Sequence, residues 1–74
     1  MNNKNKQNYT IIINEEYTYI NNFLNIIDMT ENDLYVEFKD FNIKINGTNI
    51  KIIKLMDNEI KFDGQIESIS YYYK

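Results

Sequence analysis

The sequence predicts a small all-β protein of one domain, and three observations support this. Apolar and polar residues alternate over most of the 74 residues, as in LYVEF at residues 34–38 and FNIKI at residues 41–45. Such alternation is typical of strands that are half buried. Residues that favour strands, above all isoleucine and tyrosine, are abundant. No stretch sustains the three-and-four spacing of an amphipathic helix, and alanine is absent.

Eight strand candidates follow one another along the chain, separated by short polar links. They are residues 9–13, 16–20, 23–29, 33–38, 41–45, 49–56, 59–62 and 65–72. The strongest turn signals are Asn46-Gly47 and Asp63-Gly64, which contain the only two glycines. A two-residue type I′ hairpin turn needs positive φ at both positions, and Asn or Asp followed by Gly adopts this with least strain. We therefore expect hairpin turns at these two dipeptides.

Three places break the strict alternation of apolar and polar residues. The isoleucine pairs at residues 26–27 and 52–53 each indicate a β-bulge or a strand that is buried on both faces. Ile66 and Ile69 fall out of phase with each other, which predicts another bulge near residues 67–68.

The chain also overlays itself when it is shifted by about 26 residues. IIDMTENDLYV, which begins at Ile26, then meets IIKLMDNEIKF, which begins at Ile52. An internal repeat of this length is typical of structures built from similar units. We predict a small antiparallel meander that curls into a sandwich-like sheet with a repeat of roughly 26 residues. A short β-solenoid is the alternative, but Asn-Gly and Asp-Gly turns favour the meander because hairpins join antiparallel neighbours.

The composition argues against several classes of function. The net charge is −3 and the lysines are spread out, so the chain lacks the basic face of a nucleic-acid-binding protein. Histidine, cysteine and arginine are absent, so no histidine is present to activate Ser68 or Ser70. Most carboxylates lie beside turns, where they keep a sheet soluble. We therefore expect no enzyme activity, no metal site and no cofactor.

The domain organisation is simple. Residues 1–8 are polar and rich in asparagine, which predicts a disordered N-terminal arm before a single domain at residues 9–74. No apolar run approaches the roughly 18 residues that would indicate a membrane span. A core this small is marginal, so the fold is either very tight or gains stability from a partner or from a second copy of itself.

Tyrosine is the most informative side chain in the sequence. Tyr71, Tyr72 and Tyr73 close the last predicted strand and form a candidate interface, because tyrosine is enriched at protein interfaces. In a strand, Tyr72 must point away from the face that carries the other two. Tyr17 and Tyr19 share one face of a strand and are candidates for stacking on a ligand. Aromatic pairing that only stabilises the sheet is the third interpretation of these rings.

The segments IKINGTNIKI at residues 43–52 and IKFDGQIESISY at residues 60–71 carry a family resemblance. Their pattern of aliphatic residues and glycines resembles that of the YabP/YqfC family of sporulation proteins. The resemblance covers about residues 11–71 and includes Gly47 and Gly64, but the family pattern names no catalytic residues.

The resemblance implies a protein that is made during sporulation and is not an enzyme. It implies a role in assembly of the spore envelope, meaning coat and cortex, with a membrane-protein partner of the sporulation machinery. The expected location is the cytoplasm of the mother cell, peripheral at the forespore membrane. From this we expect a scaffold or adaptor that binds partners at its sheet edges. The alternative is a small glycan-binding β module that uses Tyr17 and Tyr19.

Overall fold

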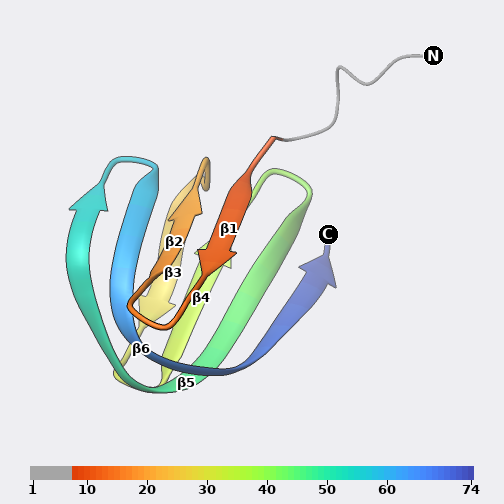
Figure 1. Cartoon of the computed structure of the whole chain (residues 1–74). Helices are drawn as coiled ribbons and strands as arrows, with labels where there is room; N and C mark the ends of the chain where they lie inside the picture. The colour runs from red at the N-terminus through yellow and green to blue at the C-terminus, as the bar shows by residue number, and fades with distance from the viewer. Residues whose placement is uncertain (1–7) are drawn as a thin grey trace.

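The structure is a computed structural model that describes residues 8–74. These residues form six strands and no helix (Figure 1). The strands are β1 (Thr10–Ile13), β2 (Thr18–Asn21), β3 (Asn25–Met29), β4 (Asp33–Glu37), β5 (Phe41–Met56) and β6 (Glu59–Tyr73). They form one open sheet in the order β1-β2-β6-β5-β4-β3, and all neighbours are antiparallel. The predicted antiparallel all-β fold is confirmed, and the parallel coils of the solenoid alternative do not occur in the described part of the chain.

The predicted N-terminal arm, residues 1–8, lies outside the described residues except for Asn8. The backbone carbonyl of Asn8 accepts a hydrogen bond of 2.9 Å from Nδ2 of Asn22. Asn22, which follows β2, has a φ of 61°. Asparagine tolerates this left-handed conformation better than most residues do.

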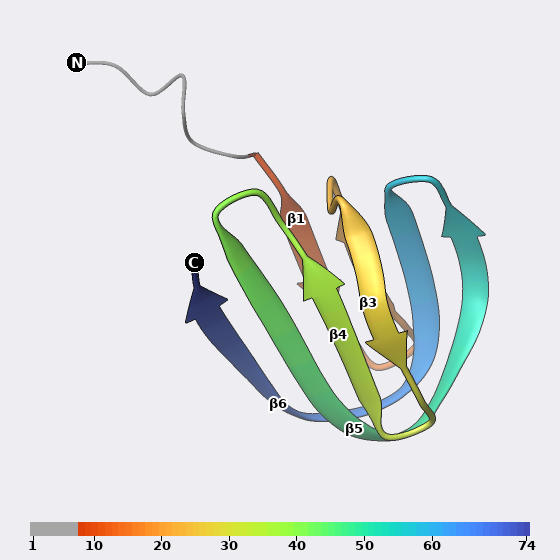
Figure 2. The same ribbon diagram turned by 180° about the vertical axis from the view of Figure 1, so that it is seen from behind.

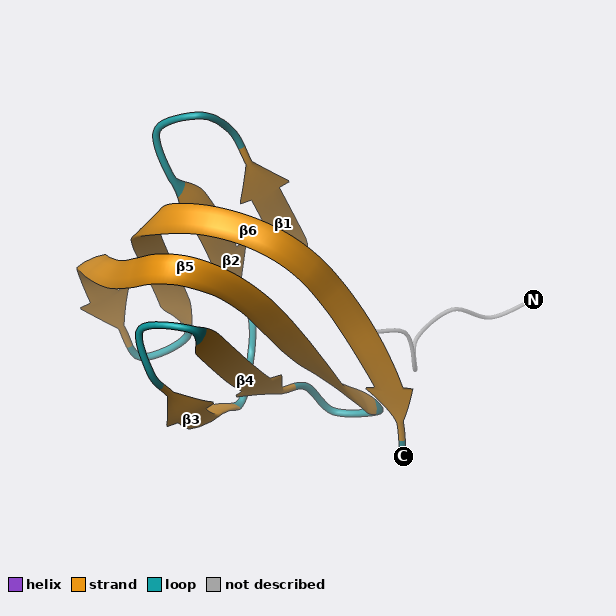
Figure 3. Cartoon of the chain, turned by 90° about the horizontal axis from the view of Figure 1, so that it is seen from below, coloured by secondary structure: helices purple, strands orange, loops and turns teal. Residues whose placement is uncertain are grey.

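The two long strands β5 and β6 bend in the middle, and this bend folds the sheet into two arms. Each long strand meets a shorter neighbour along only part of its length. In β5, only residues 42–46 pair with β4, and in β6, only residues 59–62 pair with β2. The first arm contains β3, β4, residues 41–46 of β5 and residues 68–73 of β6. The second arm contains β1, β2, residues 51–56 of β5 and residues 59–63 of β6. Figure 3 shows β5 and β6 arching from one arm to the other.

The core fills the space between the arms. The buried apolar residues of the first arm and its turn are Leu34, Val36, Phe38, Phe41, Ile43 and Ile45, and those of the second arm are Ile20, Ile60 and Phe62. Phe23 and Ile50 are buried where the chain passes between arms. Because strand side chains alternate between faces, every second residue of β2, β4, residues 41–45 of β5 and residues 59–62 of β6 reaches this core. Each such burial contributes about 1.5–3 kcal/mol of transfer free energy.

Asn46-Gly47 and Asp63-Gly64 do not reverse the chain, so the prediction of hairpin turns there is wrong. Both dipeptides lie inside long strands, at the bend of β5 and β6. The chain reverses instead at residues 57–58, between the two strands. As a result, four of the predicted strands merge into two, and the structure has six strands rather than eight.

The glycines are needed because the two backbones approach each other closely at the bend. A Cβ atom on Gly47 would collide with the backbone oxygen of Gln65. Gly64 has a φ of +119°, and a Cβ atom there would lie 2.7 Å from the backbone oxygen of Asn49. Glycine inside a strand often marks such a close approach or a bulge.

All three predicted irregularities are bulges. The pairing of β3 with β4 skips Ile27, and the pairing of β5 with β6 skips Ile53 and Glu67. A bulge adds one unpaired residue and increases the local twist of the strand. In β5 and β6, these bulges accompany the bend that separates the arms.

The strand register reproduces the predicted repeat. The equivalent pairs are Ile26–Val36 and Met29–Leu34 in the first arm, and Ile52–Phe62 and Leu55–Ile60 in the second arm. Each pair in the second arm lies 26 positions after its counterpart in the first arm. The bulge residues Ile27 and Ile53 are also 26 positions apart. β3 and residues 51–56 of β5 are therefore equivalent, and they form the edges of the two arms on the same side of the molecule (Figure 2).

Candidate functional site

The bent sheet leaves four strand edges without a strand partner among the described residues. β1 and β3 end the strand order. Residues 51–56 of β5 pair only with β6, and residues 65–73 of β6 pair only with β5. We call the side with β1 and residues 65–73 the closed side, and the side with β3 and residues 51–56 the open side. Unpaired edges present backbone N–H and C=O groups, so each is a place where another strand can add.

The three predicted interface tyrosines lie on the C-terminal edge of β6, at the margin of the sheet in Figure 1. Their exposed fractions are 43% for Tyr71, 49% for Tyr72 and 78% for Tyr73. The rings of Tyr71 and Tyr73 stack with centroids 6.4 Å apart, and both contact Phe41. Tyr72 points to the opposite face, where its ring meets that of Tyr35 at 6.4 Å. The edge therefore offers aromatic contacts on both faces of the sheet.

Tyr9 joins the two arms on the closed side. Its ring lies 5.0 Å from that of Phe38 and 5.2 Å from that of Phe41, measured between centroids. Its hydroxyl group lies 3.3 Å from the hydroxyl of Tyr71, 62 residues away in sequence. The hydrogen bond with Tyr71, together with burial and the charge of Tyr71 when ionised, raises the pKa of Tyr9 to about 12. Sequence reasoning missed this contact because no local pattern connects the two ends of the chain.

Lys74 fastens the C-terminal end of β6 to the first arm. Its backbone N–H donates to the carbonyl of Asp40 at 3.0 Å, and its Nζ donates to the carbonyl of Phe38 at 2.7 Å. Nζ also forms an ion pair of 2.9 Å with Oε2 of Glu37, whose Oε1 accepts a hydrogen bond from Asn25. The hydrogen bonds from Lys74 and Asn25, and the charge of Lys74, lower the pKa of Glu37. The tyrosine edge is therefore held in place at its terminal residue.

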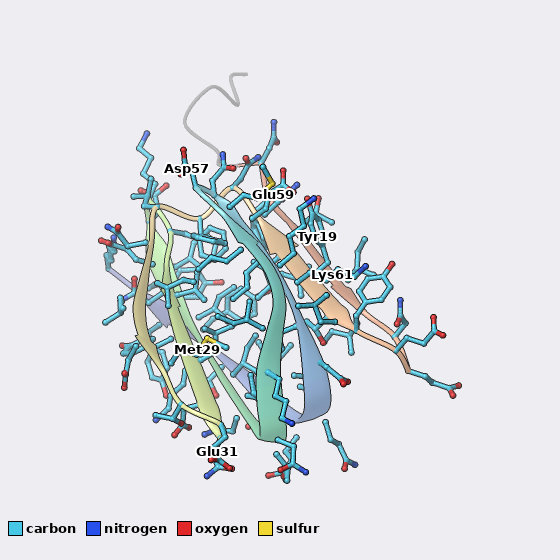
Figure 4. The ribbon with its side chains drawn as sticks, turned by 90° about the vertical axis from the view of Figure 1, so that its left-hand side faces the viewer. Tyr19, Met29, Glu31, Asp57, Glu59 and Lys61 are labelled. Atoms are coloured by element: carbon cyan, nitrogen blue, oxygen red, sulfur yellow. The ribbon has the colours of Figure 1, made fainter. Side chains whose placement is uncertain are left out.

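The two tyrosines predicted to stack on a ligand do lie together, on the outer face of the second arm. They line an open hollow of about 350 Å³, formed by Ile12, Tyr17, Tyr19, Lys54, Glu59, Ile60 and Lys61. Nζ of Lys61 lies 4.3 Å from the centroid of the Tyr17 ring, which is a cation–π contact. Tyr19 lies opposite Lys61 in the ladder between β2 and β6 (Figure 4).

A broader depression of about 840 Å³ lies over the bend. Its lining consists of Asn14, Glu15, Thr48, Asn49, Lys51, Asp63, Gly64, Gln65 and Ile66. Asp63 accepts a hydrogen bond of 2.7 Å from the N–H of Gly64, so this carboxylate supports the bend. Within residues 8–74, no group of three or more His, Cys, Asp or Glu side chains is placed to hold a metal ion. The described chain also contains no helix with the length and apolar character to cross a membrane.

Sequence reasoning also missed the open side. Residues 51–56 are all exposed, although four of them are apolar. The exposed isoleucines of the two bulges, Ile27 and Ile53, lie on this side. The isoleucine doublets at residues 26–27 and 52–53 are the only features of the sequence that point to this side. A doublet indicates a bulge, but it does not show that the strand has a free edge.

A comparison with protein families connects this fold to known proteins. The family model described as the YabP family matches residues 4–74, which is nearly the whole chain. A search of curated proteins and a search of solved structures each found no match. The family match includes both segments, residues 43–52 and 60–71, that carried the resemblance. The chain therefore belongs to the YabP family, and this membership indicates a sporulation-related protein.

Proposed function

We propose that this protein is a non-enzymatic scaffold or adaptor in assembly of the spore envelope, meaning its coat and cortex. Family membership supports the link to sporulation. The free edge at residues 65–73 of β6, with its exposed tyrosines, is the observation that supports the mechanism. A partner strand that pairs with this edge would extend the first arm by one strand. Main-chain hydrogen bonds would supply affinity, and the side chains beside them would supply selectivity.

The tyrosines suit this role because they present large rings on both faces of one edge. Tyr73 is 78% exposed and Tyr72 is 49% exposed, so a partner strand would cover much ring surface. Successive side chains of that strand would meet Tyr72 on one face and Tyr73 on the other. Tyrosines often carry a large share of the binding free energy at protein interfaces. Lys74 holds this edge through its contacts with Glu37 and Phe38, which lowers the entropy lost on binding.

We propose a membrane protein of the sporulation machinery as the partner, which would place the chain at the forespore membrane from the mother-cell cytoplasm. The net charge of −3 supports attachment through a protein rather than through lipid. Membrane surfaces rich in anionic lipids attract basic segments and repel acidic proteins. Electrostatic attraction to lipid would not hold a protein of this charge at such a surface, so in our proposal a protein partner supplies the attachment.

A photo-crosslinking amino acid at position 73 tests this proposal in sporulating cells. We expect it to capture a membrane protein, whereas the same group at Glu16, an exposed residue before β2, should not. The captured protein is then purified and its affinity for the chain measured by titration. Tyr72→Ala and Tyr73→Ala should each weaken binding by about tenfold, as expected for aromatic residues that anchor an interface.

Glu16→Ala is the matched control and should leave the affinity unchanged. Equal capture from positions 16 and 73 would contradict the proposal, and so would a purified partner that binds the tyrosine variants normally. Circular dichroism of each variant shows whether the sheet is intact, so that lost binding is not mistaken for lost folding.

The hollow lined by Tyr17 and Tyr19 supports a second candidate, a small glycan-binding module. Aromatic rings on a sheet can stack on sugars, and Lys54 and Lys61 would favour an acidic glycan. This candidate predicts saturable binding of soluble peptidoglycan fragments that is lost in Tyr19→Ala. Fragments that do not bind the wild-type chain would exclude it. Lys61 already lies over the Tyr17 ring, which leaves less of that ring for a sugar and favours the scaffold.

A further inference from the structure

The open side carries several apolar side chains that residues 8–74 leave exposed. Its exposed apolar side chains are Leu24, Ile27, Ile52, Ile53, Leu55 and Met56, with exposed fractions from 46% to 55%. The contrast within β5 is sharp, because residues 41–47 alternate between buried and half-buried whereas residues 51–56 are all exposed. Leu24 and Ile26 of one edge line the same groove as Leu55 and Met56 of the other, and exposed apolar side chains that gather in this way are typical of a site of interaction.

The two edges of the open side run in opposite directions with a defined stagger. Figure 2 shows β3 pointing down and the end of β5 pointing up. Near the bend, the N–H of Ile50 donates to the carbonyl of Glu31 at 2.8 Å. At the other end, residues 24–26 and 55–57 line the same shallow groove of about 360 Å³. Figure 4 looks onto this side, with Glu31 at one end and Asp57 at the other.

The two edges carry opposite charges at matching heights, and one such pair, Asp28 and Lys54, also occupies equivalent positions of the repeat. Asp28 of β3 pairs with Tyr35, and Lys54 of β5 pairs with Lys61, so both project from the outer faces of their arms. By the stagger described above, Asp28 lies about level with Lys54. Glu31 of the first arm is likewise about level with Lys51 of the second. The edge at β3 is therefore acidic and the edge at residues 51–56 is basic.

We propose that a second copy of this chain covers the open side, forming a two-fold symmetric dimer in which β3 of each copy pairs with residues 51–56 of the other. A two-fold axis parallel to the strands places the first arm of one copy beside the second arm of the other. The rotation does not change the position of any residue along the strand direction. β3 of one copy then meets β5 of the other in antiparallel orientation, with the stagger that already exists within one copy. The contacts between Asp28 and Lys54 and between Glu31 and Lys51 each form twice, as a closed two-fold interface requires.

The charges select this arrangement over the other two-fold dimer. A two-fold axis perpendicular to the two arms would instead place β3 of one copy against β3 of the other. Residues 51–56 of one copy would likewise meet residues 51–56 of the other. Acidic side chains would then face acidic ones, and lysines would face lysines, which destabilises neighbouring strands. Bulges and lysines can also protect an edge from association. Here only one of the two edges carries lysines, and the other carries the acids that complement them.

In the proposed dimer, each arm of one copy continues into an arm of the other. The interface covers Ile27 and Ile53, the exposed isoleucines of the bulges in β3 and β5. It leaves the tyrosine edge of β6 free, because that edge lies on the closed side. Self-association therefore does not depend on the partner proposed above, and each can fail without the other.

Sedimentation equilibrium of the full chain tests the dimer. We expect the wild type to dimerise, and we expect Asp28→Lys and Lys54→Asp each to raise the dissociation constant by about tenfold, because each change turns two attractive contacts into repulsive ones. An equimolar mixture of these two variants, and the double variant Asp28→Lys with Lys54→Asp, should both regain the wild-type affinity. Asp40→Lys and Lys44→Asp make the same changes of charge away from the open side and should leave the constant unchanged.

A second test does not depend on charge and uses the absence of cysteine from the chain. Oxidation should crosslink a mixture of Asp28→Cys and Lys54→Cys chains, but neither variant alone. A chain that stays monomeric up to its solubility limit would overturn the proposal. Dimers that are indifferent to the single charge reversals, or a disulfide between two Asp28→Cys chains, would overturn it as well.

Discussion

The closed and open sides of the bent sheet differ in what joins the two arms. On the closed side, Tyr9 reaches from the segment before β1 to Phe38, Phe41 and Tyr71. On the open side, the middle of each edge carries exposed isoleucines. The closing residues come from the two terminal segments of the described chain, whereas the open side is built from its middle. Within residues 8–74, no terminal segment lies beside the open side to cover its apolar residues.

The largest expected difference between the sides comes from truncating one apolar residue on each. Phe41→Ala should lower the free energy of unfolding by about 3–4 kcal/mol, because Phe41 is buried and contacts four other rings. Leu55→Ala should lower it by about 1 kcal/mol or less in the monomer, because Leu55 is 51% exposed. Urea unfolding followed by circular dichroism measures both. Equal losses would show that the open side is as well packed as the closed side.

The bend that separates the two sides should be nearly as sensitive. Gly64→Ala should cost about 2–3 kcal/mol, because alanine is strained at a φ of +119° and its Cβ would press on the backbone of Asn49. Asn49→Gly is the matched control, because Asn49 has a φ of 56° that glycine adopts without strain. The same urea titration measures both variants. A harmless Gly64→Ala would mean that the strands can separate at the bend without loss.

A smaller effect is expected from the hydroxyl pair that closes one side. Tyr9→Phe should lower the free energy of unfolding by about 1 kcal/mol or less, which is typical for the loss of one hydrogen bond. It should also change the response to alkali. The pKa of Tyr9 is raised from 10.0 to about 12 in the folded chain, so its contribution is present below pH 10 and is lost as the pH rises towards 12.

The pH dependence of the unfolding free energy measures this effect. The wild type should lose more stability over that alkaline range than Tyr9→Phe does. Tyr17→Phe, which leaves the pair between Tyr9 and Tyr71 intact, should follow the wild type. Parallel curves for all three proteins would show that the hydroxyl pair between Tyr9 and Tyr71 does not stabilise the closed side.

The smallest effect should come from the ion pair that fastens Lys74. Because Lys74 and Asn25 lower the pKa of Glu37, its contribution to stability is present at neutral pH and is lost as the pH falls through the titration range of the folded carboxylate. Surface ion pairs contribute little, so the change should be slight and should shrink at high salt. Melting temperatures of the wild type and Glu37→Gln, measured from neutral pH to about pH 3, should converge at the acidic end. A constant difference across that range would assign the effect to packing.

Much of the fold could be predicted from the sequence, because alternation and bulges are local features of a strand. The doublets at residues 26–27 and 52–53 and the 26-residue repeat all reappear in the strand register. The prediction of hairpin turns at Gly47 and Gly64 is wrong, because Asn-Gly and Asp-Gly suit both a hairpin turn and a bend within a strand. The choice between the two depends on the backbone across the ladder, namely Gln65 for one glycine and Asn49 for the other.

The candidate site was predictable only in part, for a related reason. Alternation correctly predicted that Tyr72 faces away from Tyr71 and Tyr73. Which edges stay free depends on β2 pairing with only four residues of β6, a contact between distant parts of the chain. The open side and the bridge made by Tyr9 follow from such distant pairings, so no local pattern could reveal them.

The position of Asn46-Gly47 inside a strand also has a consequence for the chemical lifetime of the chain. Asparagine before glycine is the sequence most prone to deamidation, in which the glycine nitrogen attacks the asparagine side chain to form a succinimide. Here the Gly47 N–H is held by the carbonyl of Asn32 at 2.9 Å, and Nδ2 of Asn46 donates to Asp33. These two hydrogen bonds restrain the attacking nitrogen and the amide in the folded chain, so this ageing reaction should be slower there than in molecules that have unfolded at the bend.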